Sequence, residues 1–173
     1  EAIDAYFAAV QANAEYTEAY FAMGTAQKKL NKNAEALAAF DRTVQLNPKM
    51  PEAHYMKGST LRALNRLKDA AEAYQAALAV SPTYALAHYW LGETHKELGQ
   101  YDAAIAAYTA AIKYDVRKYA KAYCKIGDIL ELKGDLQGAL EQYGKMPAYD
   151  RQWHTYAQDK IKYINSVLKK QSS

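Results

Sequence analysis

Cysteine is nearly absent from this chain, since one residue in 173 is a cysteine, and no internal disulfide can form. Proline and glycine are also scarce, at 4 and 8 residues, and no apolar run approaches the roughly 20 residues that a membrane helix needs. Lys and Arg number 22 against 19 Asp and Glu, and a net charge of +3 is too small for a chain that mainly grips nucleic acid phosphates. These absences argue against a disulfide scaffold, a membrane-spanning protein and a general polyanion binder.

The sequence begins at Glu1 without a charged-then-apolar leader, which is compatible with a segment excised from a longer protein. The single thiol slightly favours a cytoplasmic location. What the chain does have is 50% hydrophobic residues and 16 tyrosines, with alanine the commonest residue. This composition indicates helices that pack through small contacts and aromatic plugs.

The sequence repeats itself with a period of about 34 residues. Three columns of like residues recur in register over four copies. They are Gly24, Gly58, Gly92 and Gly127; Ala36, Ala70, Ala104 and Ala139; and Phe40, Tyr74, Tyr108 and Tyr143. Pro48 and Pro82 close the first two copies, whereas Val116 and one extra residue stand at the third boundary. Such a period is typical of a stacked repeat architecture.

Each copy divides into two helical patterns. In the third copy, residues 85–98 carry a stripe of bulky side chains with helical spacing, and Gly99 supplies a stop signal. A second amphipathic pattern covers residues 102–114. Because the connection between the two is short, we expect them to pack as antiparallel helices.

The third copy, ALAHYWLGETHKELGQYDAAIAAYTAAIKYD, resembles a tetratricopeptide repeat. The resemblance rests on Leu91-Gly92, Leu98-Gly99-Gln100-Tyr101, Ala104, Tyr108 and Ala111, while His88 departs from the family at its fourth place. The family implies an all-α fold, namely a right-handed superhelical α-solenoid of helix-turn-helix repeats with a C-terminal capping helix. Function is not implied with the same force, because such arrays are general binding scaffolds.

The columns predict a single domain over residues 1–173. Residues 1–13 match the second helix of a preceding repeat, residues 17–50, 51–84, 85–119 and 120–147 match four repeats, and residues 150–169 match a capping helix. Gly138 and Gly144 weaken the last repeat, so we expect that end to be the softer one. The open N-terminal helix invites stacking with another chain.

In the tetratricopeptide family the first helices line a concave groove, and their fifth and sixth places point into it. In this chain the fifth places hold Phe21, Tyr55, Tyr89 and Cys124, and the sixth hold Ala22, Met56, Trp90 and Lys125. We therefore expect Phe21, Tyr55, Met56, Tyr89 and Trp90 to be apolar partner contacts, with Cys124 as a small groove residue. The alternative is that these aromatic side chains merely contact one another across neighbouring helices.

Charged residues occupy other groove columns. The twelfth places hold Lys28, Arg62, Lys96 and Glu131, the ninth hold Thr25, Ser59, Glu93 and Asp128, and Lys121 and Lys125 lie in the fourth repeat. We expect Lys28, Arg62, Lys96, Lys121 and Lys125 to orient a peptide whose acidic residues lie toward the first repeat. A solvated helix face with internal pairs such as Glu93–Lys96 is the competing interpretation.

Two binding modes of the family are not indicated. The chaperone-tail clamp, which grips a C-terminal carboxylate, keeps only Lys121 and Lys125, because Tyr55, Ser59 and Trp90 occupy its other places. The asparagine ladder of the family's glycosyltransferases and peroxisomal import receptors is also missing from the sixth places.

No combination of residues points to catalysis. His54 and His88 share one packing column, which indicates a repeated structural role rather than a metal pair. Cys124 has Lys125 beside it, which favours a thiolate, but it lacks a His partner. We expect a chain that is not an enzyme, that has no cofactor and no metal, that does not bind nucleic acid and that does not insert into a membrane.

The leading hypothesis is a non-catalytic adaptor that binds a partner peptide or helix in the concave groove. The alternatives are a self-assembling structural scaffold, or the recognition segment of a longer multidomain protein.

Overall fold

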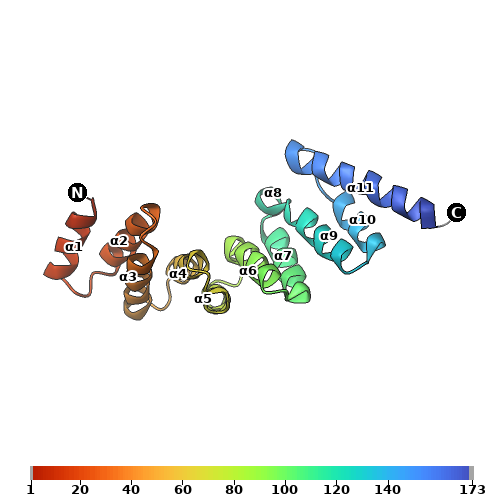
Figure 1. Ribbon diagram of the computed structural model, residues 1–173. Coiled ribbons are helices and arrows are strands. Elements are labelled where there is room, and N and C mark those ends of the chain that lie inside the picture. The colour runs from red at the N-terminus through yellow and green to blue at the C-terminus, as the bar shows by residue number, and fades with distance from the viewer. Residues whose placement is uncertain (1, 172–173) are drawn as a thin grey trace.

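The helices follow one another along the molecule, with the two ends of the chain at opposite ends (Figure 1). The computed structural model describes residues 2–171, apart from the side chains of residues 2, 4 and 171, and within that range all regular structure is α-helical. The helices are α1 (Ala2–Ala12), α2 (Thr17–Lys29), α3 (Asn33–Leu46), α4 (Pro51–Ala63), α5 (Leu67–Val80), α6 (Ala85–Glu97), α7 (Tyr101–Tyr114), α8 (Val116–Tyr119), α9 (Ala122–Leu132), α10 (Leu136–Gly144) and α11 (Arg151–Gln171). The predicted all-α solenoid is confirmed.

The first helix of each repeat ends at a residue with left-handed backbone. Asn31 and Asn65 have φ of 58°, Gly99 has 72° and Gly134 has 81°. Asn and Gly are the residues that tolerate this conformation, which lets the chain reverse and start the second helix. In each repeat the following residue closes the turn through its N–H, as Gln100 does by donating to the carbonyl of His95 at 2.8 Å. Only Gly99 was recognised from the sequence as a stop signal.

A glycine of the first helix faces an aromatic ring of the second helix in every repeat. The rings of Phe40, Tyr74, Tyr108 and Tyr143 are at most 1% exposed. A Cβ atom at Gly92 would lie 2.7 Å from the ring of Tyr108, and one at Gly24 would lie 2.9 Å from Phe40. The recurring glycine is therefore the space that the ring needs, and the two columns together set how closely the paired helices approach.

The third boundary differs from the other two. Where Pro48 and Pro82 stand in the earlier repeats, the chain forms the single turn α8. Asp115 caps this turn by accepting a hydrogen bond from the N–H of Lys118 at 3.1 Å. The extra residue at this boundary is thus accommodated as a helical turn, and Tyr119 at its end is buried.

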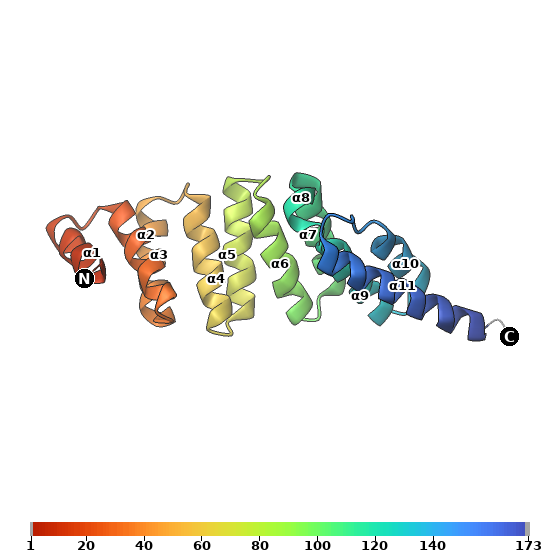
Figure 2. The ribbon, with the colours of Figure 1, turned by 90° about the horizontal axis from the view of Figure 1, so that it is seen from above.

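The C-terminal helix α11 lies over α9 and α10 (Figures 1 and 2). Its apolar side packs on Cys124, Ala139 and Tyr143 in one cluster. The α11 residues of that cluster are Trp153, Tyr156, Ala157, Ile161, Ile164 and Leu168. The helix covers an apolar surface that the last repeat would otherwise leave open.

At the other end, α1 packs on α2. Tyr6 is half-buried, although the aromatic residues in the same column of the four repeats are fully buried. Phe7 is 54% exposed. The outer side of α1 therefore presents apolar surface; the expected helical segment 1–13 begins with Glu1, which lies outside the described residues.

Candidate functional site

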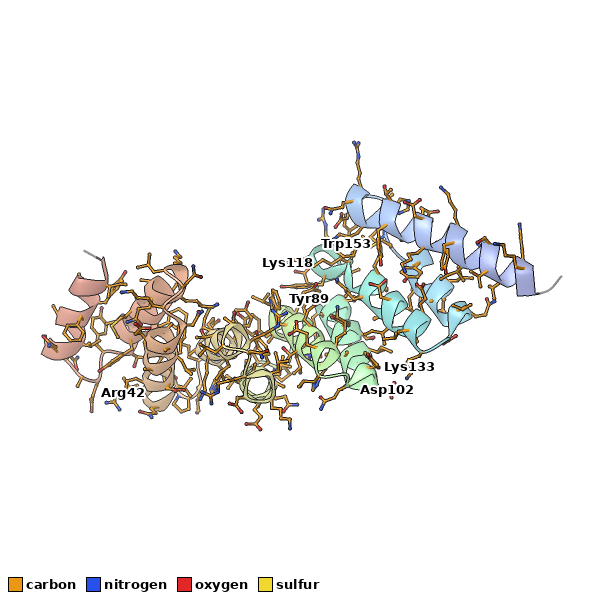
Figure 3. All side chains as sticks on the ribbon, in the orientation of Figure 1. Arg42, Tyr89, Asp102, Lys118, Lys133 and Trp153 are labelled. Atoms are coloured by element: carbon orange, nitrogen blue, oxygen red, sulfur yellow. The ribbon has the colours of Figure 1, made fainter. Side chains whose placement is uncertain are left out.

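The candidate site is the face formed by the first helices α2, α4, α6 and α9. Its C-terminal end is visible in Figure 3, where Tyr89, Lys118 and Trp153 gather around the place at which α6, α8 and the start of α11 meet. The sequence assigned the fifth, sixth, ninth and twelfth places of these helices to the face. The structure shows which of those side chains are available and which are already engaged within the chain.

The fifth-place rings pack against the second helix of their own repeat. Ring centroids are 5.8 Å apart for Phe21 and Phe40 and 5.7 Å apart for Tyr55 and Tyr74. Phe21 and Tyr55 remain half-buried, so part of each ring is open. Tyr89 is only 5% exposed and belongs to the core, which corrects its expected place as an open apolar contact. For this residue the competing interpretation, rings in contact with one another, describes the structure.

A column of tyrosines that the sequence analysis missed completes the aromatic surface. The residues immediately before the repeats that begin at 17, 51, 85 and 120 are Tyr16, Met50, Tyr84 and Tyr119, and Tyr149 stands directly before Asp150 near the start of α11. The ring of Tyr84 lies 5.7 Å from that of Tyr55, and the ring of Tyr119 is stacked on Tyr89 at 5.4 Å. Tyr84 directly precedes α6 and Tyr119 ends α8, so each pair ties a first helix to the segment that leads into the next first helix. The period of about 34 residues also relates Tyr16, Met50, Tyr84 and Tyr119. A comparison of the residues that directly precede each repeat would have revealed this column.

Trp90 is held by a cation from the preceding repeat. The guanidinium carbon of Arg62 lies 4.8 Å from the centroid of the Trp90 ring, and Arg62 also forms an ion pair with Glu97. Trp90 and Met56 are half-buried on this face. Arg62 is therefore engaged within the chain, and its expected role in orienting a ligand stays a prediction.

The ninth column receives hydrogen bonds from the buried tyrosines of the second helices. The hydroxyl of Tyr108 donates to Glu93 at 2.7 Å, and that of Tyr143 donates to Asp128 at 2.8 Å. Burial first, and then these carboxylates, raise the pKa of both hydroxyls well above the usual value of 10. The ninth-column carboxylates are thus structural acceptors, a role that the sequence analysis did not assign to them.

The lysines of the face differ in their surroundings. Lys96 pairs with Glu93 at 3.8 Å, as the competing interpretation expected. Lys28 is half-buried, and burial lowers its pKa. Lys121 and Lys125 lie over aromatic rings, at 4.7 Å from the Tyr89 centroid and 5.0 Å from the Trp153 centroid. Lys121 and Lys125, both in the fourth repeat, are therefore held over rings and form no ion pair among the described residues.

Cys124 is not a groove residue. Its side chain is fully buried beneath α11, and its thiol donates to the carbonyl of Trp153 at 3.7 Å. Burial is the main cause that raises the pKa of the thiol to about 12, with Asp128 adding to the effect and Lys125 opposing it. The expected small groove residue is thus a core residue, and the influence of Lys125 is too weak to make it a thiolate.

The two histidines of the shared column have one structural role, as predicted. The Nε2 atoms of His54 and His88 each lie 2.9 Å from the carbonyl oxygen of Pro48 and Pro82, respectively. Each ring thereby ties the start of a first helix to the turn before it. Over residues 2–171, no three His, Cys, Asp or Glu side chains are placed to hold a metal ion together. None of the helices in that range is both long and apolar enough to cross a bilayer.

Paired antiparallel helices that stack through glycine and aromatic columns, with a capping helix at one end, define the molecule as a helical repeat solenoid. The profile of the tetratricopeptide repeat family matches residues 21–85, 55–95 and 89–150. The chain belongs to the tetratricopeptide repeat family.

Solved structures of other proteins share the fold. MamA is 26% identical, with a TM-score of 0.80 over 95% of this chain and 89% of that one. YrrB, described as a tetratricopeptide repeat protein with an unusual peptide-binding site, is 22% identical, with a TM-score of 0.80 over 96% and 85%. The thermophilic protein TTC0263 of Thermus thermophilus is 21% identical, with a TM-score of 0.66 over 92% and 88%. No curated protein sequence matches the chain.

Proposed function

We propose that the chain is a non-catalytic adaptor that binds a peptide or helix of a partner protein along the face of the first helices. The observation that carries the proposal is a set of large apolar side chains that stay partly open on this face although they are firmly held. They are Phe21, Tyr55 and Trp90, each held against a ring or a cation of the chain, with the half-buried Met56 next to Tyr55 in the sequence. Side chains that are fixed before a ligand arrives lose little conformational entropy when it binds.

The contacts of Trp90 support this preorganisation most directly. Arg62 covers its ring and is itself fixed by Glu97. A partly exposed tryptophan in a fixed orientation is the kind of residue that dominates protein interfaces. YrrB, a fold relative, is described as having a peptide-binding site, which agrees with a recognition function for this architecture. The buried free thiol agrees with the cytoplasmic location that the sequence favours.

The test is affinity capture from lysate with the full chain and with the double variant Tyr55→Ala, Trp90→Ala, followed by mass spectrometry. Each lost anchor should weaken binding by about 2 kcal/mol, so the double variant should lose its partner. Tyr163→Ala is the matched control, because Tyr163 is 59% exposed on α11 and lies outside the face.

Tyr55 also packs on Tyr74, so the fold of the double variant has to be checked by circular dichroism. Met56→Gln provides a milder second variant, because it keeps most of the side-chain volume at that position. A partner retained equally by all variants contradicts the proposal.

Self-assembly through α1 is the second candidate. The half-open Tyr6 favours it, since the aromatic residues of its column are covered in all four repeats, and the exposed Phe7 adds apolar surface beside it. Sedimentation velocity over a wide concentration range distinguishes the two candidates: self-assembly requires mass to grow with concentration, and Phe7→Ser should abolish the growth. A monomer at every concentration excludes it.

A further inference from the structure

Three lysines at the C-terminal end of the candidate face lie over aromatic rings and have no acidic partner among the described residues. The Nζ atom of Lys118 is 5.6 Å from the centroid of Tyr119, that of Lys121 is 4.7 Å from Tyr89, and that of Lys125 is 5.0 Å from Trp153. We refer to Lys118, Lys121 and Lys125 as the lysine strip.

The strip is continuous. Tyr89 and Tyr119 are stacked at 5.4 Å, so Lys118 and Lys121 lie over one aromatic pair. Lys125 follows Lys121 by one helical turn, and its N–H donates to the carbonyl of Lys121 at 3.2 Å. The three ammonium groups therefore follow one another along the same side of α8 and α9.

The carboxylates around the strip are already engaged by other groups of the chain. Glu93 accepts from Tyr108 at 2.7 Å, Asp115 from the N–H of Lys118 at 3.1 Å, Asp128 from Tyr143 and Tyr156 at 2.8 and 2.7 Å, and Glu131 from Lys160 at 2.8 Å. The local network thus uses its acidic groups for structure, and none of the described carboxylates forms an ion pair with Lys118, Lys121 or Lys125. A ligand that supplies carboxylates would complement this arrangement.

The strip lies between two hollows of the surface. At one end is a cleft of about 550 Å³ whose lining includes Tyr84, Lys118 and Tyr119. At the other is a hollow of about 250 Å³ whose lining includes Lys125 and Trp153. A segment that crosses the strip can therefore place flanking side chains in both.

The N-terminal half of the face offers no equivalent. Arg62 is paired with Glu97, and Lys96 with Glu93. Lys28, in the first repeat, has no ion pair among the described residues but is a single cation, whereas Lys118, Lys121 and Lys125 lie together where the third repeat meets the fourth. This reverses the direction that the sequence suggested, in which acidic ligand residues lay toward the first repeat.

We propose that the lysine strip binds an acidic segment of the partner, with at least two Asp or Glu side chains over Lys118, Lys121 and Lys125. This inference rests on the proposed adaptor function and adds the chemistry and direction of the partner segment. The ligands are internal side-chain carboxylates rather than a chain terminus, because Tyr55, Ser59 and Trp90 leave no basic or amide group to complete a terminal carboxylate site.

The experiment starts from a random twelve-residue phage library selected on the full chain. The enriched peptides should contain two or more Asp or Glu residues. The strongest is then synthesised with an amidated C-terminus, and its affinity is measured by fluorescence anisotropy at low and high salt. It should bind the double variant Lys121→Gln, Lys125→Gln at least about tenfold more weakly than the wild type, and added salt should weaken wild-type binding.

Lys32→Gln, Lys68→Gln is the matched control, because both lysines are exposed outside the face and the change in net charge is the same. The control should bind like the wild type. The selected peptides could instead lack acidic enrichment and lose affinity on Trp90→Ala but not on the lysine substitutions. That result would contradict acidic binding by the lysine strip and would leave the adaptor function supported. Peptides that are indifferent to both sets of variants, or a library that yields no binder, overturn both. A requirement for the free C-terminus overturns the side-chain assignment.

Discussion

A single glycine in each repeat determines how well a buried ring fits between two helices. At Gly92 a Cβ atom would lie 2.7 Å from the ring of Tyr108, closer than van der Waals contact allows, and the ring has no exposed side to move toward. By contrast, nothing lies within 4 Å of a Cβ atom placed on Gly144. The two glycines therefore have opposite effects on stability. Gly92 leaves the space that the ring of Tyr108 needs, whereas Gly144 only weakens its helix.

Gly92→Ala should lower the free energy of unfolding by about 1–3 kcal/mol, because the ring or the helix has to shift. Gly144→Ala should leave it unchanged or raise it by up to about 1 kcal/mol, because alanine favours the helix and meets no obstacle. Urea unfolding of the two variants checks both values. Equal effects would contradict the close packing of glycine and ring.

The tyrosines at the repeat boundaries make the fold sensitive to alkaline pH. Burial first, then Glu52, raises the pKa of Tyr84 to about 12, and burial first, then Asp115, raises that of Tyr119 to about 12. The unfolded value is near 10, so the folded state holds these protons more tightly. Their stabilising contribution is complete below about pH 10 and is lost as the pH rises from there through about 12.

Urea midpoints measured from about pH 9 to pH 12 should therefore fall for the wild type. The fall should be smaller for the double variant Tyr84→Phe, Tyr119→Phe, because phenylalanine cannot ionise. Tyr163→Phe, at an exposed tyrosine, should follow the wild type. If the double variant loses stability as steeply as the wild type, the hydroxyls of Tyr84 and Tyr119 are not the cause of the alkaline loss of stability.

Cys124 gives a second chemical readout at the residue scale. Because the thiol is buried and its pKa is raised to about 12, it should react very slowly with a thiol reagent such as 5,5′-dithiobis(2-nitrobenzoic acid) near neutral pH. Denaturation in urea should release one reactive thiol at once. Rapid labelling of the folded protein would contradict the burial of Cys124 and would indicate that its side chain lies on the groove surface.

At the scale of elements, α11 covers the apolar side of the last repeat. Neighbouring residues on this helix provide a matched pair, since Ile164 is fully buried against the last repeat and Tyr163 is 59% exposed. Ile164→Ala should cost about 3 kcal/mol through the cavity that it leaves. Tyr163→Ala should cost under about 0.5 kcal/mol. Urea unfolding gives both values, and similar losses would mean that α11 is not held by this apolar side.

The elements also show what the sequence could and could not predict. The period, the paired helices and the capping helix follow from columns of small and aromatic residues, because tight packing leaves each such column few alternatives. The state of individual face residues does not follow, since it depends on contacts between repeats. Tyr89 is buried by Tyr119 and Cys124 by α11, and neither neighbour belongs to the helix from which the position was read. The column of Tyr84 and Tyr119 escaped notice because it lies outside the paired helices, with Tyr84 directly before α6 and Tyr119 at the end of the short α8.

For the whole molecule, the important property is that each helix packs mainly on its neighbours in the chain. A change at one end should then stay near that end, as expected for a quasi-one-dimensional array. In Ile164→Ala, hydrogen exchange should accelerate in α9, α10 and α11 and stay unchanged in α2 and α3. Exchange that rises equally along the chain would indicate one global unfolding unit instead.

The tyrosine pairs at the boundaries also give the array unequal resistance to stretching. The Tyr55–Tyr84 pair joins α4 to the residue that directly precedes α6, and the Tyr89–Tyr119 pair joins α6 to the end of α8, which leads into α9. Between the first and second repeats, Met50 takes the place of the tyrosine, and no ring pair crosses that boundary among the described residues. If the two ends of the molecule were pulled apart, the junction of α3 and α4 would yield before the other two. We therefore expect the array to be most compliant between α3 and α4. The junctions around Trp90 and the lysine strip, which ring pairs support, should be stiffer.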